Sequence, residues 1–140
     1  MPHCLGAVDA PNNQYCITNS SILCSLCYNY KKSFSLILLA ACDTNLTFSL
    51  VDFPVGSQSD GGVFVRSGFG KEILQNTLPV PESLNLPGSA VCSPYYFVGD
   101  NAFPLRVNVM RPYPGRNLLY DKFHCNKTLS TTRVRIEMAF

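Results

Sequence analysis

The feature that most constrains the fold is a near-continuous apolar run, FSLILLAAC, from Phe34 to Cys42. The run is about half of the ~20 apolar residues that a membrane-crossing helix needs. A short apolar run without a polar face is typical of a strand that is buried on both sides of a sheet. We therefore predict a central strand over residues 33–43 and no membrane span.

Shorter segments predict the elements around this strand. The apolar runs at 4–10 and 95–100 predict two further strands, and 48–53 alternates well enough to be the hairpin partner of the central strand. Ser59 or Asp60 is expected to cap a helix reaching residue 78, although Gly68 and Gly70 make a continuous helix doubtful.

The last third of the chain predicts one more helix. Residues 79–93 are rich in proline and are expected to form a surface excursion before the strand at 95–100. Ser130 is expected to cap a final helix. Val134 and Met138, and likewise Ile136 and Phe140, are four residues apart, which is the spacing of side chains on one face of a helix. The order of strands and helices predicts a mixed α/β layout.

Length and composition set the class of protein. The chain has 140 residues, of which 46% are hydrophobic and 14% charged. These values predict one globular domain over residues 1–140 with a hydrophobic core. The net charge of +2 does not by itself indicate nucleic-acid binding, nor does it exclude it, because basic residues can gather on one face. We expect a domain truncated at both ends, because the first predicted strand begins almost at the first residue and the last predicted helix lacks a C-cap residue such as glycine.

The cysteines leave two cellular environments open. Seven cysteines without a regular framework indicate free thiols in a reducing compartment. Three glycosylation triplets, at Asn19, Asn45 and Asn126, keep a secreted, cysteine-rich binding domain as an alternative. The pair in CSLC, Cys24 and Cys27, has the spacing of half a zinc site, but no second close pair completes it.

Acidic residues follow several of the predicted elements. Asp9 and Asp100 each end a strand, Asp60 stands at the start of the first helix, and Glu137 lies in the last helix. If the two strands are neighbours, their carboxylates repel and one pKa rises unless a divalent cation binds. Oxygen ligands select Mg²⁺ or Mn²⁺, and two such ions about 4 Å apart can promote phosphodiester cleavage. Arg133, one turn before Glu137, can hold that carboxylate or reach a phosphate.

Each of these residues also has a purely structural interpretation. An aspartate after a strand is commonly a turn or cap residue, and Asp60 can be a helix cap. Arg133 and Glu137 can be a solvated surface pair. The spacing alone leaves both interpretations open.

Four segments together resemble the DDE endonuclease domain of PIF/Harbinger transposases and their domesticated relatives. The resemblance covers residues 6–140 and is carried by GAVDAP, SFSLILLAACDTNLTFSLVDFPVGSQSDGGVF, FVGDNAFPLRVNVMRPYPGRN and CNKTLSTTRVRIEMAF. It implies an α/β, RNase H-like mixed sheet flanked by helices, with an acidic metal site at the strand ends. The implied activity is DNA cleavage by a transposase-derived nuclease that uses two divalent ions, Mg²⁺ or Mn²⁺.

The same resemblance assigns roles to residues. Asp9, Asp100 and Glu137 match the catalytic, metal-binding acids, and Asp60 matches a further acid that assists the metal site. The resemblance also implies DNA as the substrate, a separate Myb-like DNA-binding partner, and a location in the nucleus with the cytoplasm as the alternative.

Some positions depart from the family pattern. Ala10 and Asn12 stand where the first motif of the family has glycine and histidine, and Lys127 and Thr131 stand where aromatic and basic residues are common. The departures keep a second hypothesis open, in which the domain is a catalytically silent transposon remnant that binds DNA or protein.

Basic residues provide candidates for a DNA-backbone surface. Contacts from lysine and arginine to phosphates supply affinity rather than sequence choice. The alternative is ordinary solubilising charge. The candidate residues are Lys31, Lys32, Arg111, Arg116, Arg133 and Arg135.

Overall fold

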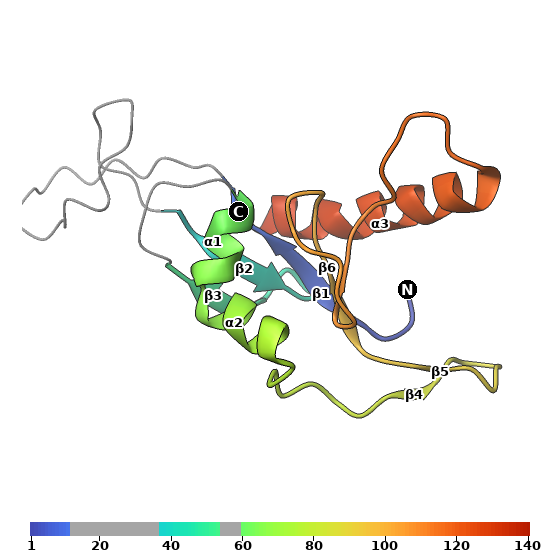
Figure 1. The fold of residues 1–140 in the computed structure, drawn as a ribbon, viewed down its shortest axis with the longest axis horizontal. Helices are drawn as coiled ribbons and strands as arrows, with labels where there is room; N and C mark the ends of the chain where they lie inside the picture. The colour runs from blue at the N-terminus through green and yellow to red at the C-terminus, as the bar shows by residue number, and fades with distance from the viewer. Residues whose placement is uncertain (12–36, 54–59) are drawn as a thin grey trace, which may run out of the picture.

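The computed structural model of the chain describes residues 1–11, 37–53 and 60–140 (Figure 1). Lys31, Lys32 and the CSLC pair lie outside the described residues. Strands and helices follow one another in the order β1 (Cys4–Asp9), β2 (Leu39–Cys42), β3 (Phe48–Asp52), α1 (Asp60–Arg66), α2 (Gly68–Gln75), β4 (Leu84–Asn85), β5 (Cys92–Ser93), β6 (Tyr96–Val98), β7 (Val109–Met110) and α3 (Tyr120–Ala139).

Five strands form one mixed sheet in the order β3-β2-β1-β6-β7. β1 pairs antiparallel with β2, and β2 pairs antiparallel with β3. β1 pairs in parallel with β6, and β6 with β7. All residues of β2 are buried, which confirms the predicted strand over residues 39–42. Of the rest of the predicted range 33–43, residues 37, 38 and 43 are outside the strand, and residues 33–36 lie outside the described residues. The mixed α/β class is therefore confirmed.

The sheet lies between two helical layers (Figure 1). Successive residues of a strand point to opposite faces, and in β1 Val8 packs in the cluster that contains Phe64 of α1 and Phe69 of α2. Its neighbour Ala7 packs on the other face against Ile136 of α3. The core is thus divided by the sheet, with α1 and α2 on one side and α3 on the other.

The first helical segment is broken, as its glycines suggested. α1 and α2 meet at Ser67, whose hydroxyl donates to the carbonyl oxygen of Phe64 at 2.6 Å and accepts the N–H of Gly70 at 2.8 Å. A Cβ at position 70 would lie 1.7 Å from the carbonyl oxygen of Phe64. Glycine is required there because the two helices turn sharply around this point.

The final helix begins earlier than predicted. α3 starts at Tyr120, and the chain enters it from Leu119 in an extended conformation, so the cap predicted at Ser130 is wrong. Ser130 lies exposed in the interior of the helix. Serine and threonine usually disfavour a helix interior because their side chains compete for backbone partners. Here, three threonine hydroxyls donate to carbonyl oxygens four residues earlier in the same helix: Thr128, Thr131 and Thr132.

The apolar face of α3 also differs from the predicted spacing. Leu129 and Ile136, two turns apart, are the fully buried side chains of the helix. Val134 and Met138 are 44% and 61% exposed. The helix packs through a narrow apolar stripe, and its remaining surface is free for other contacts.

Several smaller findings complete the fold. The proline-rich excursion contains the β4–β5 hairpin, which projects away from the main sheet (Figure 1). The short edge strand β7 was not predicted. In the part of the chain that the structure describes, no helix is long and apolar enough to cross a membrane. The cysteines described there are free thiols: Cys4, Cys42, Cys92 and Cys125.

Candidate active site

Two acidic residues lie at the ends of adjacent parallel strands. Asp9 is the last residue of β1, and Asp100 follows shortly after β6. The last paired residues of the two strands are Ala7 and Val98, which precede Asp9 and Asp100 by two residues each. The carboxyl ends of parallel strands meet at the same edge of a sheet, so the two acids, far apart in the sequence, come to one edge. The two strands are neighbours, as the prediction required, and the charge of Asp100 acts on the carboxylate of Asp9.

Helix α3 brings two more charged residues to this edge. The helix crosses β1, β2 and β6, with Ile136 packed against Ala7. Arg133 and Glu137 lie one turn apart on its surface. Both interact electrostatically with the carboxylate of Asp9, as Asp100 does. The structure therefore gathers Asp9, Asp100, Arg133 and Glu137 into one electrostatic cluster.

The pKa of Asp9 is raised above its ordinary value, chiefly because the half-buried carboxyl group is desolvated. The N–H of Ala10, which donates to Oδ1 at 2.9 Å, and the charge of Arg133 lower the pKa. The negative charges of Asp100 and Glu137 raise it. Burial thus outweighs the groups that favour the ionised form of Asp9, and a raised pKa of this kind is common at functional sites.

Arg133 supplies part of the missing countercharge. Its Nη2 lies 3.8 Å from Oε1 of Glu137, at the long end of ion-pair distances. Its Nε is buried and has no hydrogen-bond partner among the described residues, an arrangement that costs free energy in a folded protein. The guanidinium therefore interacts with Asp9 and Glu137 mainly through its charge and does not form a complete set of hydrogen bonds.

The loop after β6 holds Asp100 in place. Oδ1 of Asp100 accepts the N–H of Ala102 at 2.8 Å, which is also the turn role that the sequence left open. Nη1 of Arg111 donates to the carbonyl oxygens of Asn101 and Phe103, at 3.4 and 3.3 Å. Phe103 is fully buried. These contacts restrain the segment that carries Asp100.

Comparison with known proteins identifies the family. The sequence model described as DDE superfamily endonuclease matches residues 9–140 of this chain. The chain belongs to this family. The match confirms the resemblance that the sequence motifs carry.

One relative of this chain is a plant protein. Protein ALP1-like from Arabidopsis thaliana is 28% identical over 147 aligned residues, which cover 99% of this chain and 34% of the relative. The chain thus spans about a third of the length of that protein. No solved structure matches the chain.

Asp9, Asp100 and Glu137 have side chains that suit a hard divalent cation, because carboxylate oxygens are the donors that Mg²⁺ and Mn²⁺ prefer. Nevertheless, among residues 1–11, 37–53 and 60–140, no three His, Cys, Asp or Glu residues form a metal-ligand group. Glu137 is paired with Arg133, and one oxygen each of Asp9 and Asp100 accepts a backbone N–H. The metal site stays a prediction.

The remaining predicted site residues have separate locations. Asp60 is the first residue of α1, and its side chain is outside what the structure describes. Arg116 is exposed in the loop before α3. Arg135 and Arg133 are two residues apart on α3, so their side chains leave the helix in different directions. Their predicted contacts with DNA stay predictions.

Two structural roles near the site were not predicted from the sequence. Arg111 was considered only as a phosphate contact, yet it ties the Asp100 loop together. Asn126 was considered as a glycosylation acceptor, yet its side chain binds both the N–H and the carbonyl oxygen of Tyr113, at 2.8 and 3.0 Å. Neither role has a local sequence signal, because each joins segments that only the fold brings together.

Proposed function

We propose that this chain is a divalent-metal-dependent DNA endonuclease domain, derived from a transposase, that hydrolyses phosphodiester bonds. The observation that supports the proposal is that Asp9 ends β1 and Asp100 follows its parallel neighbour β6, while the charges of Asp100 and Glu137 both act on the carboxylate of Asp9. The strand order β3-β2-β1-β6-β7, in which only β2 runs antiparallel to β1, β3, β6 and β7, supports an RNase H-like fold.

Each acid has a defined part in this mechanism. Asp9 and Asp100 would hold cations from the strand ends and Glu137 from α3, with Asp60 assisting. When bound, two divalent ions supply the charge that activates a water molecule and stabilises the departing 3′ oxygen. Arg133 orients Glu137 and offsets the repulsion among the acids. Direct hydrolysis by water requires no covalent enzyme intermediate.

A plasmid-nicking assay tests the proposal. Supercoiled DNA is incubated with Mg²⁺ or Mn²⁺ and either the wild-type domain, Asp100→Asn, or the exposed control Glu82→Gln. Removing one strongly stabilising charge from a transition state typically lowers the rate by about 10²–10³-fold. We expect that loss for Asp100→Asn and full activity for Glu82→Gln. Equal nicking by the wild type and Asp100→Asn would rule out this site.

A second function is a catalytically silent module that binds DNA or protein. It is favoured by Ala10 and Asn12 at the positions where the family motif has glycine and histidine. In that case the wild type leaves the plasmid intact with either metal while still binding DNA.

The proposed activity implies a cellular setting. A DNA-cutting domain of this kind would act in the nucleus, with the cytoplasm as the alternative, and would use a separate Myb-like protein to select its target. Co-purification of such a protein with the full-length gene product, and imaging of that product in cells, test these two points.

A further inference from the structure

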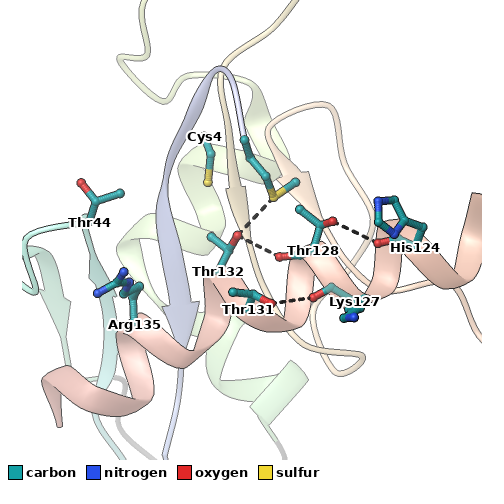
Figure 2. Close-up of a pocket in the computed structure, with 9 residues that line it drawn as sticks. Cys4, Thr44, His124, Lys127, Thr128, Thr131, Thr132 and Arg135 are labelled. Carbon is teal, nitrogen blue, oxygen red and sulfur yellow. Dashed lines mark hydrogen bonds between the residues drawn. The ribbon is translucent and has the colours of Figure 1, made fainter.

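A groove of about 470 Å³ follows one flank of α3. Figure 2 shows the helix side chains that line it, with Cys4 of β1 and Thr44 of the β2–β3 turn lying across from them. The lining residues from α3 are His124, Lys127, Thr128, Thr131, Thr132 and Arg135.

This groove is separate from the acidic edge. An α-helix has 3.6 residues per turn, so the side chains of residues two positions apart point in nearly opposite directions. Arg135 lines the groove, whereas Arg133 and Glu137 form their ion pair with Asp9 nearby. The groove and the acids therefore occupy two different flanks of the same helix.

The groove is cationic. Lys127 and Arg135 line it, and none of the described residues that line it is an aspartate or a glutamate. Across the described ranges, neither of these side chains makes an ion pair or a hydrogen bond, whereas Arg133 is paired. Asp43 precedes the lining residue Thr44 in the sequence. Its Oδ1 accepts the backbone N–H groups of Asn45 and Thr47 within the same turn, at 2.8 and 3.0 Å. Two cations thus face the groove without countercharge.

The cations are spaced for an extended ligand. At a rise of 1.5 Å per residue, Lys127 and Arg135 are separated by roughly 12 Å along α3. The helix surface between them carries threonine hydroxyls, which are polar and uncharged (Figure 2). A single phosphate cannot reach both cations, but a chain of phosphates can.

We infer that this groove binds the phosphodiester backbone of the DNA, outside the stretch held at the acidic edge. The inference rests on the proposed function for the choice of DNA as the polyanion. Phosphate contacts of this kind add affinity and fix the orientation of the duplex without reading its sequence. DNA bound at the acids would be held by a second contact across α3.

The test measures the salt dependence of DNA binding. Fluorescence anisotropy with a labelled duplex, in EDTA and between 50 and 200 mM salt, compares the wild type with the double variant Lys127→Gln/Arg135→Gln. Each phosphate contact contributes about 0.9 to the slope of log K against log salt concentration. We expect the slope to fall by about 1.8 and the affinity to fall at least 10-fold at low salt. The matched control is Lys71→Gln/Arg106→Gln, which removes the same charge at exposed sites outside the groove.

The outcomes separate this inference from the proposed function. An unchanged slope in the groove variant, an equal fall in the control, or no binding by the wild type at 50 mM salt overturns the groove. Nicking by the wild type in any of these cases leaves the proposed function standing. Weaker binding by the groove variant alone, with no nicking by the wild type, supports the groove and overturns the catalytic function. Thermal unfolding of each variant shows that the fold is kept.

Discussion

At the scale of single residues, the fold disfavours the ionised form of Asp9, which is the form that the proposed metal binding needs. Burial and the charges of Asp100 and Glu137 disfavour its ionised form, and the N–H of Ala10 and Arg133 only partly compensate. A divalent cation bound at this carboxylate would favour the ionised form and offset both the burial and the repulsion. In the absence of metal, the ionised carboxylate should destabilise the folded protein.

The first prediction concerns Asp9→Asn in EDTA. The folded-state pKa of Asp9 is raised above 3.8, so the folded protein holds this proton more tightly than the unfolded chain. Wild-type stability is therefore lost as the pH rises from about 3.8 through the folded pKa. Asparagine cannot ionise and keeps the oxygen that accepts the N–H of Ala10. We expect the variant to be more stable by roughly 0.5–2 kcal/mol at pH 7, with its advantage disappearing towards pH 3.8.

Urea unfolding across this pH range measures the difference. Glu82→Gln, at an exposed position, serves as the control and should follow the wild type at every pH. A variant that is less stable than the wild type at pH 7 would show that Asp9 has a favourable structural role rather than an uncompensated charge.

The second prediction concerns Arg133. Its guanidinium occupies the surroundings of Asp9 and Glu137 as a permanent cation, so an incoming metal ion competes with it. We expect Arg133→Gln to bind Mn²⁺ several-fold more tightly than the wild type in isothermal titration calorimetry, while losing nicking activity. Arg135→Gln removes the same charge from the opposite flank and should leave Mn²⁺ affinity unchanged. Weaker Mn²⁺ binding by Arg133→Gln would mean that the arginine builds the site instead of competing for it.

At the scale of elements, the α1–α2 corner determines how one face of the sheet is covered. Phe64 and Phe69 on either side of the corner pack edge to face, with ring centroids 5.9 Å apart. Both belong to the cluster that contains Val8, the residue before Asp9. The close turn at Gly70 is what allows both rings to reach the same cluster.

The third prediction follows from this corner. Gly70→Ala places a Cβ 1.7 Å from the carbonyl oxygen of Phe64, a distance that the backbone must relieve by moving apart. We expect a loss of about 2–4 kcal/mol in the free energy of unfolding, since overpacking and backbone strain give large effects. The neighbouring change Lys71→Ala, at an exposed helical position, should stay within about 0.5 kcal/mol of the wild type. Urea denaturation of both variants decides whether the corner tolerates a methyl group.

The same scale shows what the sequence could predict. β1, β2, β3 and β6 were predicted because each is an apolar or alternating run that ends in turn residues. The start of α3 was missed because its first half has few apolar residues, and its threonines find partners within the helix. The acids at the strand ends were predicted from local position. The groove was not, because it depends on how α3 crosses the sheet.

At the scale of the whole molecule, the sheet topology joins the two ends of the described chain. β1 near the N-terminus lies between β2 and β6 in the sheet, and α3 near the C-terminus packs against β1. The acids therefore come from three segments that are distant in sequence but converge at one edge. An ion held by Asp9, Asp100 and Glu137 would connect these segments and could form its full set of contacts only in the folded state.

The last prediction is that divalent metal stabilises the whole fold rather than one loop. A ligand that binds only the folded state adds about 2.7 kcal/mol of stability at a hundredfold excess over its Kd. We expect Mg²⁺ or Mn²⁺ to shift the urea midpoint of the wild type by the same amount whether unfolding is followed by tyrosine fluorescence or by helical circular dichroism. Asp9→Asn and Asp100→Asn should lose most of this shift, whereas Glu82→Gln keeps it. Ca²⁺ and high NaCl serve as controls for general screening of charge. If NaCl at equal ionic strength stabilises the wild type as much as Mg²⁺ does, the acids are a region of excess negative charge and not a metal site.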